Sequence, residues 1–367
     1  MNKLKAGIIG CGAISGIYFK GGQTFEILDI IACADMYLDK AQEKAEEFHV
    51  LKACTVEELL ADDEIQIVIN LTVPQAHAKV SLAALEAGKH VYIEKPLAVT
   101  REDGRKILET AKKKGLLVGC APDTFLGGGL QTCRKLIDDG LIGKPVASSS
   151  FMMKHGPENR HPNPESFYKQ GGGPMFDMGP YYLTALISMM GPVREVTGST
   201  SISFPERIIT CQPKYGQKIN VEIPTHIVGI MNFESGAVGS IITSFDAWIT
   251  QLPWMEIYGT LGALQCPDPN TFGGSVLYKG IRDKDWREIP LTHGFTENSR
   301  GIGVADMAYA ILSGRPHRAN GEMAYHVLDI MHGFHDASRL GSHIQMTSTC
   351  IRPAQLPIGL SPLLLDE

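Results

Sequence analysis

A lysine and an aspartate carry the chemistry that this sequence suggests. Glu94-Lys95-Pro96 follows an apolar stretch, and Asp177 and Tyr181 stand four residues apart beyond a run of glycines. Burial and a neighbouring positive charge can lower the pKa of a lysine until it exchanges protons near neutral pH. Side chains four apart on a helix project to one side. Lys95 is therefore a candidate proton carrier, and Asp177 and Tyr181 are candidates to face one ligand. The alternatives are a lysine paired with a structural glutamate, and a helix cap followed by a core aromatic.

The first turn of the chain has the composition of a phosphate-binding turn. An apolar run over residues 6–9 leads into Gly10-Cys11-Gly12-Ala13-Ile14-Ser15. Gly10 permits a sharp turn, and Gly12 has no Cβ, so a pyrophosphate can approach the backbone. Ser15 is small enough for the next helix to pack on the strand, and the N-terminus of that helix offers N–H groups to the phosphates. The cofactor contacts predicted here are Gly10, Gly12, Ala13 and Ile14.

An aspartate follows the second apolar strand. Residues 28–34 lead to Asp35, which can accept hydrogen bonds from both hydroxyls of an adenosine ribose. The next residues are Met36 and Tyr37, and no arginine is present there to hold a 2′-phosphate. We therefore predict NAD in preference to NADP, with Asp35 and Met36 in contact with it. A flavodoxin-like turn followed by a surface aspartate is the alternative.

Two further apolar stretches, 65–71 and 90–93, are typical of parallel strands buried on both faces. Ligands of open parallel sheets bind beyond the carboxyl ends of the strands. We therefore expect the residues that follow each stretch to border the cofactor: Thr72, Val73, Pro74 and His77 after the first, and Glu94 and Lys95 after the second. The regular alternation of strands and helices predicts a doubly wound α/β domain of the Rossmann type over residues 1–123.

Beyond residue 123 the pattern changes. Alternating and β-branched runs such as 225–233 and 237–245 are separated by glycine-containing turns. This pattern predicts an α+β domain with a large, mostly antiparallel open sheet over residues 124–367. We expect helices at 180–190, 304–312 and 321–339.

The composition argues against several classes of protein. The chain has 367 residues, 44% of them apolar, and a formal net charge of −6, which argues against nucleic acid and anionic membranes as partners. Its eight cysteines form no C-x-x-C pair and fit reduced thiols of a cytoplasmic protein. No apolar run is long enough to cross a bilayer, and because residue 1 is followed almost directly by the first strand, we expect no signal peptide. His332 and His335 lack a third ligand at a suitable spacing, so we predict no metal site.

Taken together, the three motifs resemble the Gfo/Idh/MocA family, named after glucose–fructose oxidoreductase, inositol dehydrogenase and a protein of rhizopine catabolism. In that family the lysine of E-K-P and the aspartate and histidine of D-x-G-x-H form the usual catalytic group. Lys95 and Asp177 match this pattern, whereas Tyr181 replaces the histidine. The resemblance therefore implies that Lys95, Asp177 and Tyr181 are the catalytic residues. The pKa of a tyrosine is about 10, so Tyr181 would be a poor base at neutral pH. The resemblance therefore leaves Lys95 as the proton carrier. Asp123 occupies a position where many members have asparagine, and is expected to bind substrate hydroxyls.

The resemblance implies a dehydrogenase that transfers a hydride between NAD(P) and a secondary alcohol of a sugar, cyclitol or related polyol. One alternative is a redox-neutral enzyme that retains NAD and cleaves or epimerises a sugar through a keto intermediate. Another is a non-catalytic NAD-binding regulator. The second domain is expected to bind substrate and to form a homodimer or homotetramer through its sheet. Some of the predicted substrate contacts come from a polar insert over 154–164, which could instead be a solvated loop. The predicted contacts are Lys95, Asp123, His155, His161, Tyr168, Asp177 and Tyr181.

Overall fold

A computed structural model describes residues 3–360 and 364–365 of the chain. The chain forms two compact units, and each is assembled from segments distant in sequence. The first unit comprises residues 1–131, 292–325 and 353–367, and the second comprises residues 132–291 and 326–352. No helix of the described residues is both long enough and apolar enough to cross a membrane.

The first unit is built on a six-stranded parallel sheet, with strands ordered β3-β2-β1-β4-β5-β6. The strand order reverses between β1 and β4, which is the point where Rossmann folds bind a dinucleotide. This confirms the predicted doubly wound sheet. The strands are β1 (Leu4–Ile9), β2 (Leu28–Ala34), β3 (Lys52–Cys54), β4 (Ile67–Asn70), β5 (His90–Ile93) and β6 (Val118–Cys120).

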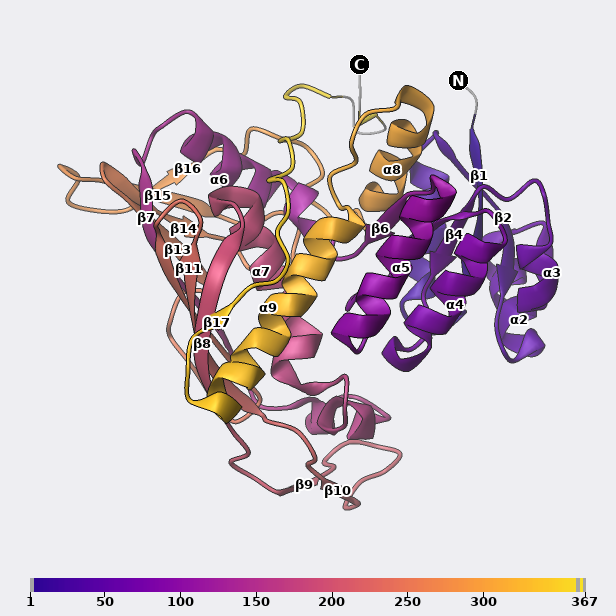
Figure 1. Cartoon of the computed structure of the whole chain (residues 1–367), viewed down its shortest axis with the longest axis horizontal. Coiled ribbons are helices and arrows are strands. Elements are labelled where there is room, and N and C mark those ends of the chain that lie inside the picture. The colour runs from indigo at the N-terminus through magenta and orange to yellow at the C-terminus, as the bar shows by residue number, and fades with distance from the viewer. Residues whose placement is uncertain (1–2, 361–363, 366–367) are drawn as a thin grey trace. The chain divides into compact units, whose positions relative to one another are not determined.

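The helices between these strands carry clear start and stop residues. Thr55 and Glu58 form a capping box at the start of α3, and Gly115, at φ 66°, ends α5 in the left-handed region. Helices α4 and α5 lie side by side against the sheet (Figure 1). The helices are α1 (Ser15–Thr24), α2 (Leu38–Phe48), α3 (Val56–Leu60), α4 (Pro74–Glu86) and α5 (Arg101–Lys114).

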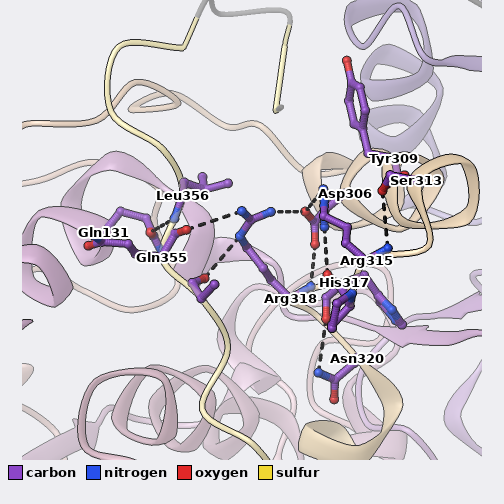
Figure 2. A network of polar contacts seen from close by, with 12 residues as sticks. Gln131, Asp306, Tyr309, Ser313, Arg315, His317, Arg318, Asn320, Gln355 and Leu356 are labelled. Carbon is purple, nitrogen blue, oxygen red and sulfur yellow. Dashed lines mark hydrogen bonds and ion pairs between the residues drawn. The ribbon is translucent and has the colours of Figure 1, made fainter. Parts of the chain in front are cut away.

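Two later segments return to the first unit and are fixed there by a buried aspartate. Asp306 on α8 (Ile302–Ser313) has no exposed surface and pairs with Arg315 at 2.9 Å and with Arg318. The other guanidinium nitrogens of Arg318 donate to main-chain carbonyls of residues 354 and 355 (Figure 2). The backbone N–H of Leu356 donates to Gln131 Oε1 at 2.7 Å. The segment that follows residue 353 is therefore held by hydrogen bonds to Arg318 and Gln131, and Arg318 is itself held by its ion pair with Asp306.

The second unit contains a nine-stranded sheet in the order β16-β15-β14-β13-β7-β12-β11-β8-β17. Only the β7–β12 pair is parallel, which confirms the predicted large and mostly antiparallel sheet. A separate two-stranded ribbon joins β9 (Glu206–Ile208) to β10 (Lys218–Asn220). The strands of the large sheet are β7 (Pro145–Met153), β8 (Val193–Ser201), β11 (His226–Phe233), β12 (Val238–Ser244), β13 (Met255–Gly259), β14 (Gly262–Cys266), β15 (Val276–Gly280), β16 (Arg287–Ile289) and β17 (Ile344–Gln345).

Two helices cover one face of this sheet. Helix α7 (Gly173–Met190) packs on β7, β11 and β12, and Gly229 leaves room for the ring of Phe334 on α9 (Gly321–Leu340). The division between the units falls within α9 and within α6 (Gly128–Asp138). The predicted helix start at 180 was wrong, because α7 begins at Gly173 and continues through Pro180. Pro180 has no N–H to donate, but burial of nearly every side chain of α7 keeps the helix continuous.

Candidate active site

The glycine turn between β1 and α1 combines a strained glycine with open space. Gly10 has φ +103°, and a Cβ there would lie 2.7 Å from the backbone of Leu71. Gly12 is exposed, and no atom lies within 4 Å of where its Cβ would be. Ser15 is fully buried, and its hydroxyl donates to the carbonyl of Gly12 at 2.7 Å. The turn is thus fixed at Gly10 and Ser15 and leaves room at Gly12, with Ala13 and Ile14 exposed beside it.

Asp35 lies at the end of β2, next to this turn. One carboxylate oxygen accepts the backbone N–H of Cys11 at 2.8 Å, and the other accepts the backbone N–H of Tyr37 at 3.0 Å. Each carboxylate oxygen can accept a second hydrogen bond. Two backbone amides therefore orient the half-buried side chain of Asp35, while Met36 is 83% exposed.

The loop after β4 is organised by Asn70, which is fully buried. Asn70 Oδ1 accepts the hydroxyl of Thr72 at 2.7 Å and its backbone N–H at 3.2 Å. The amide of Asn70 donates to Ser81 and to the carbonyl of His77. Thr72 is half-buried and Val73 is exposed, so this loop presents a surface at the carboxyl end of β4, before Pro74 begins α4.

His77 has no exposed surface. Its ring nitrogens lie 2.7 Å from the carbonyl oxygen of Pro96 and 3.0 Å from that of Thr72. Burial lowers the pKa of His77. In this structure His77 therefore supports the two loops that we expect to border the cofactor, since a side chain without exposed surface offers none to a ligand.

The residues after β5 are tied to α1. Glu94 Oε1 accepts the hydroxyl of Tyr18 at 2.8 Å, and Glu94 Oε2 accepts the backbone N–H of Lys95 at 2.9 Å. Lys95 is half-buried, whereas Glu94 is buried. The strands β1, β2, β4 and β5 are parallel neighbours, so the residues that follow them lie at one edge of the sheet. All of the predicted cofactor contacts lie at this edge except His77, which is farther along on α4. Sequence reasoning missed Tyr18, which the spacing of polar residues does not reveal.

Asp123 follows β6 and is 1% exposed. Its Oδ2 atom accepts the backbone N–H groups of Gly301 at 2.9 Å and Gly303 at 3.1 Å, at the start of α8. Burial raises the pKa of Asp123 to about 6. The side chain predicted to bind substrate hydroxyls thus serves here to cap a helix that arrives from much later in the chain.

In the second unit, Asp177 and Tyr181 lie one turn apart on α7. Asp177 is half-buried and Tyr181 is 8% exposed. The helix begins at Gly173, with Gly172 as its cap, so Asp177 lies inside the helix and does not cap it. The prediction that the two side chains share one side of a helix fits this arrangement.

The polar insert over 154–164 is more ordered than a solvated loop. The ring of His155 stacks on that of Trp248, with centroids 3.8 Å apart and planes 11° apart. His155 Nε2 also lies 3.1 Å from a carboxylate oxygen of Glu158, and burial lowers the pKa of His155. His161 packs edge-on against Phe167. His155 and His161 are both half-buried, so each retains some exposed surface.

A buried ion cluster holds this insert in place. Tyr168, which sequence reasoning assigned to the substrate, has no exposed surface, and its hydroxyl donates to Glu158. Arg207 on β9 pairs with Glu158 at 2.8 Å and with Asp246. All three charged side chains are less than 9% exposed. Sequence reasoning missed Arg207. The one indication of its role is that it is the buried middle residue of the short strand β9, between two exposed residues.

No group of three or more histidine, cysteine, aspartate or glutamate side chains within residues 3–360 and 364–365 is arranged to hold a metal ion.

Comparison with known proteins identifies both parts of the chain. Residues 4–121 match the oxidoreductase family with an NAD-binding Rossmann fold, and residues 130–265 match the GFO/IDH/MocA C-terminal domain. The chain belongs to the Gfo/Idh/MocA family. It is therefore an oxidoreductase whose first unit has an NAD-binding fold, as its motifs predicted.

Several family members resemble the chain at low sequence identity. An uncharacterised oxidoreductase of Schizosaccharomyces pombe is 27% identical over 53% of this chain, and the match spans only 56% of that relative. A myo-inositol 2-dehydrogenase of Thermotoga maritima is 25% identical over 71% of this chain and 74% of the relative. A levoglucosan dehydrogenase in complex with NADH and L-sorbose has the same fold, with a TM-score of 0.82 at 20% identity over 95% of this chain and all of that one.

Proposed function

We propose that this family member is an NAD-dependent dehydrogenase that oxidises a secondary alcohol of a sugar, cyclitol or related polyol. The observation that carries the proposal is the placement of the glycine turn, Asp35 and Lys95 at one edge of a parallel sheet. The names of the relatives support the substrate class, since one is a myo-inositol 2-dehydrogenase and another was solved with NADH and L-sorbose.

The residues of the first unit fit a dinucleotide. The open space at Gly12 admits a pyrophosphate against the backbone at the start of α1. Asp35 stands at the end of β2 with its carboxylate oriented by two amides and with lone pairs left for ribose hydroxyls. Its negative charge would repel a 2′-phosphate, and Met36 and Tyr37 supply no compensating cation. These features favour NAD over NADP.

When bound, the nicotinamide supplies the acceptor for the hydride that leaves the carbinol carbon. Lys95 takes the hydroxyl proton as the carbon–hydrogen bond breaks, so that the alcohol becomes a ketone. Asp177 orients the alcohol, and Tyr181 donates a hydrogen bond to a substrate oxygen. Lys95 is the proton carrier because tyrosine, with a pKa of about 10, is a poor base at neutral pH.

A substrate panel tests this proposal. The purified chain is mixed with NAD⁺ and sugars, cyclitols and anhydrosugars, and NADH is followed at 340 nm. We expect turnover with at least one polyol and a loss of about 10²–10⁴-fold in kcat for Lys95→Ala. Asp177→Asn should also lose activity, whereas Glu109→Gln on the exposed face of α5 should not. Conversion of a sugar without NADH accumulation would favour the redox-neutral alternative, and no response to any polyol would reject the proposal.

We also propose that the protein is a homodimer or homotetramer through the outer face of its large sheet. Val228, Ile242 and Phe151 lie in one cross-strand row on three neighbouring strands, and all three are only half-buried. Ile230 and Val238, near this row, are 43% and 48% exposed. An apolar face of this kind is typical of an association surface. Light scattering should give a mass above that of one chain, and Ile230→Lys should lower it; a wild-type monomer would refute the proposal.

A further inference from the structure

A buried phenol lies behind the residue that we assign as the proton carrier. Tyr18 is 1% exposed and sits on α1, the helix that starts directly after the glycine turn. Its hydroxyl donates to one oxygen of Glu94, whose other oxygen accepts the backbone N–H of Lys95. Burial raises the pKa of Tyr18 well above its usual value, so the phenol remains a donor. The carboxylate of Glu94 therefore connects α1 to the backbone of Lys95.

A second contact is made to the next residue of the same segment. Pro96 follows Lys95 directly, and its carbonyl oxygen lies 2.7 Å from Nδ1 of His77. The other ring nitrogen lies 3.0 Å from the carbonyl oxygen of Thr72, in the loop after β4. His77 is fully buried on α4. The neutral ring of His77 has one N–H, so it can donate to only one of these two carbonyls at a time. The backbone around Lys95 is thus tied to α1 through Glu94, and the carbonyl of Pro96 beside it is in contact with His77 on α4.

We propose that Tyr18 and His77 are positioning residues for Lys95, and that Tyr18 couples the place of the glycine-turn helix to that of the lysine. The inference rests on the proposed function in that it takes Lys95 as the proton carrier. A lysine side chain is long and flexible, so its amine reaches one place reproducibly only if its backbone is fixed. Displacement of a reacting group by about 1 Å can cost about 100-fold in rate. Neither residue touches the substrate; each acts through the main chain beside Lys95.

Tyr18→Phe and Tyr92→Phe form a matched pair for the test. Each change removes one phenol hydroxyl from a fully buried ring, and the two ring centroids are 6.4 Å apart. The hydroxyl of Tyr92 has no hydrogen-bond partner among the described residues, whereas that of Tyr18 holds Glu94. With a polyol that the wild-type enzyme oxidises, we expect kcat to fall at least tenfold in Tyr18→Phe, with less than a threefold change in the KM for NAD. Tyr92→Phe should stay within twofold of wild type, and His77→Asn should behave like Tyr18→Phe.

A second measurement needs no substrate. Lysines are labelled by reductive methylation, and the rate at Lys95 is read by peptide mass spectrometry relative to the exposed Lys20. Loss of the Tyr18 hydrogen bond should raise the relative rate at Lys95 at least threefold, and Tyr92→Phe should leave it unchanged. If the chain oxidised no polyol, the proposed function would be refuted, but the labelling rate would still show whether Tyr18 holds Lys95 in place. The inference is overturned if Tyr18→Phe and Tyr92→Phe give the same labelling rate at Lys95 or, in an active enzyme, the same kcat.

Discussion

The two glycines of the first turn should respond in opposite ways to the same change. In Gly10→Ala, the new Cβ would lie 2.7 Å from the backbone of Leu71, and the residue would keep φ near +103°. In Gly12→Ala, the new Cβ would meet nothing within 4 Å, and the backbone is outside the left-handed region. The first change should therefore damage the fold, and the second should damage only the binding of a ligand that uses the open space.

The magnitudes follow from these two environments. A positive φ costs an alanine about 1–2 kcal/mol, and displacing the backbone of residue 71 adds to that, so Gly10→Ala should destabilise the chain by about 2–4 kcal/mol. A glycine-to-alanine change without strain stabilises a protein by about 0.4–1 kcal/mol. If the Cβ at Gly12 breaks one hydrogen bond to a phosphate, worth about 1.5–3 kcal/mol, the Kd for NADH should rise by about 10–100-fold.

Two assays separate these effects. Urea unfolding of the ligand-free proteins gives the free energy of unfolding, and NADH fluorescence titration gives the Kd. We expect Gly12→Ala to be at least as stable as wild type, by up to about 1 kcal/mol, and to bind NADH weakly, whereas Gly10→Ala should have a clearly lower midpoint. If Gly12→Ala bound NADH as tightly as wild type, the pyrophosphate could not lie on this turn. Equal destabilisation by both changes would refute the structural distinction between the two glycines.

Three further changes probe the coenzyme preference, the buried ion pairs and the acid sensitivity. Asp35→Ala should weaken NADH binding at least tenfold and narrow the preference over NADPH, measured by fluorescence titration of both; unchanged selectivity would contradict the role of the carboxylate. Asp306→Ala leaves Arg318 unpaired and buried, so it should lower the free energy of unfolding by about 3–5 kcal/mol in urea, whereas Glu109→Gln, in an exposed pair, should cost less than about 1 kcal/mol. Burial lowers the pKa of His326 to about 4, so only the unfolded chain gains that proton between pH 6.5 and 4. Stability should therefore fall as the pH drops through this window, and His326→Gln should flatten the decline; an unchanged slope in urea titrations at several pH values would exclude His326 as its source.

Local sequence patterns predicted the strands β1, β2, β4 and β5 of the first unit, whereas the short strand β3 was not predicted. The apolar runs, the glycine turn and the capping box at Thr55 all depend on interactions between residues close in sequence. The same holds for Lys95 after β5 and for Asp177 and Tyr181 on one helix. The start of α7 was missed, because Pro180 is a good local reason to begin a helix and only the burial of the whole segment overrides it.

The amino-acid sequence by itself indicated the doubly wound α/β domain, the resemblance to the family, and the residue types that can bind a nicotinamide cofactor and transfer a proton. Tertiary structure decided which polar side chains are occupied elsewhere. Asp123 caps α8 through Gly301 and Gly303, and Tyr168 donates to Glu158, although both side chains looked equally suited to a sugar. The physical reason is that a buried polar group must be paired, and its partner can come from any part of the chain that folding brings beside it.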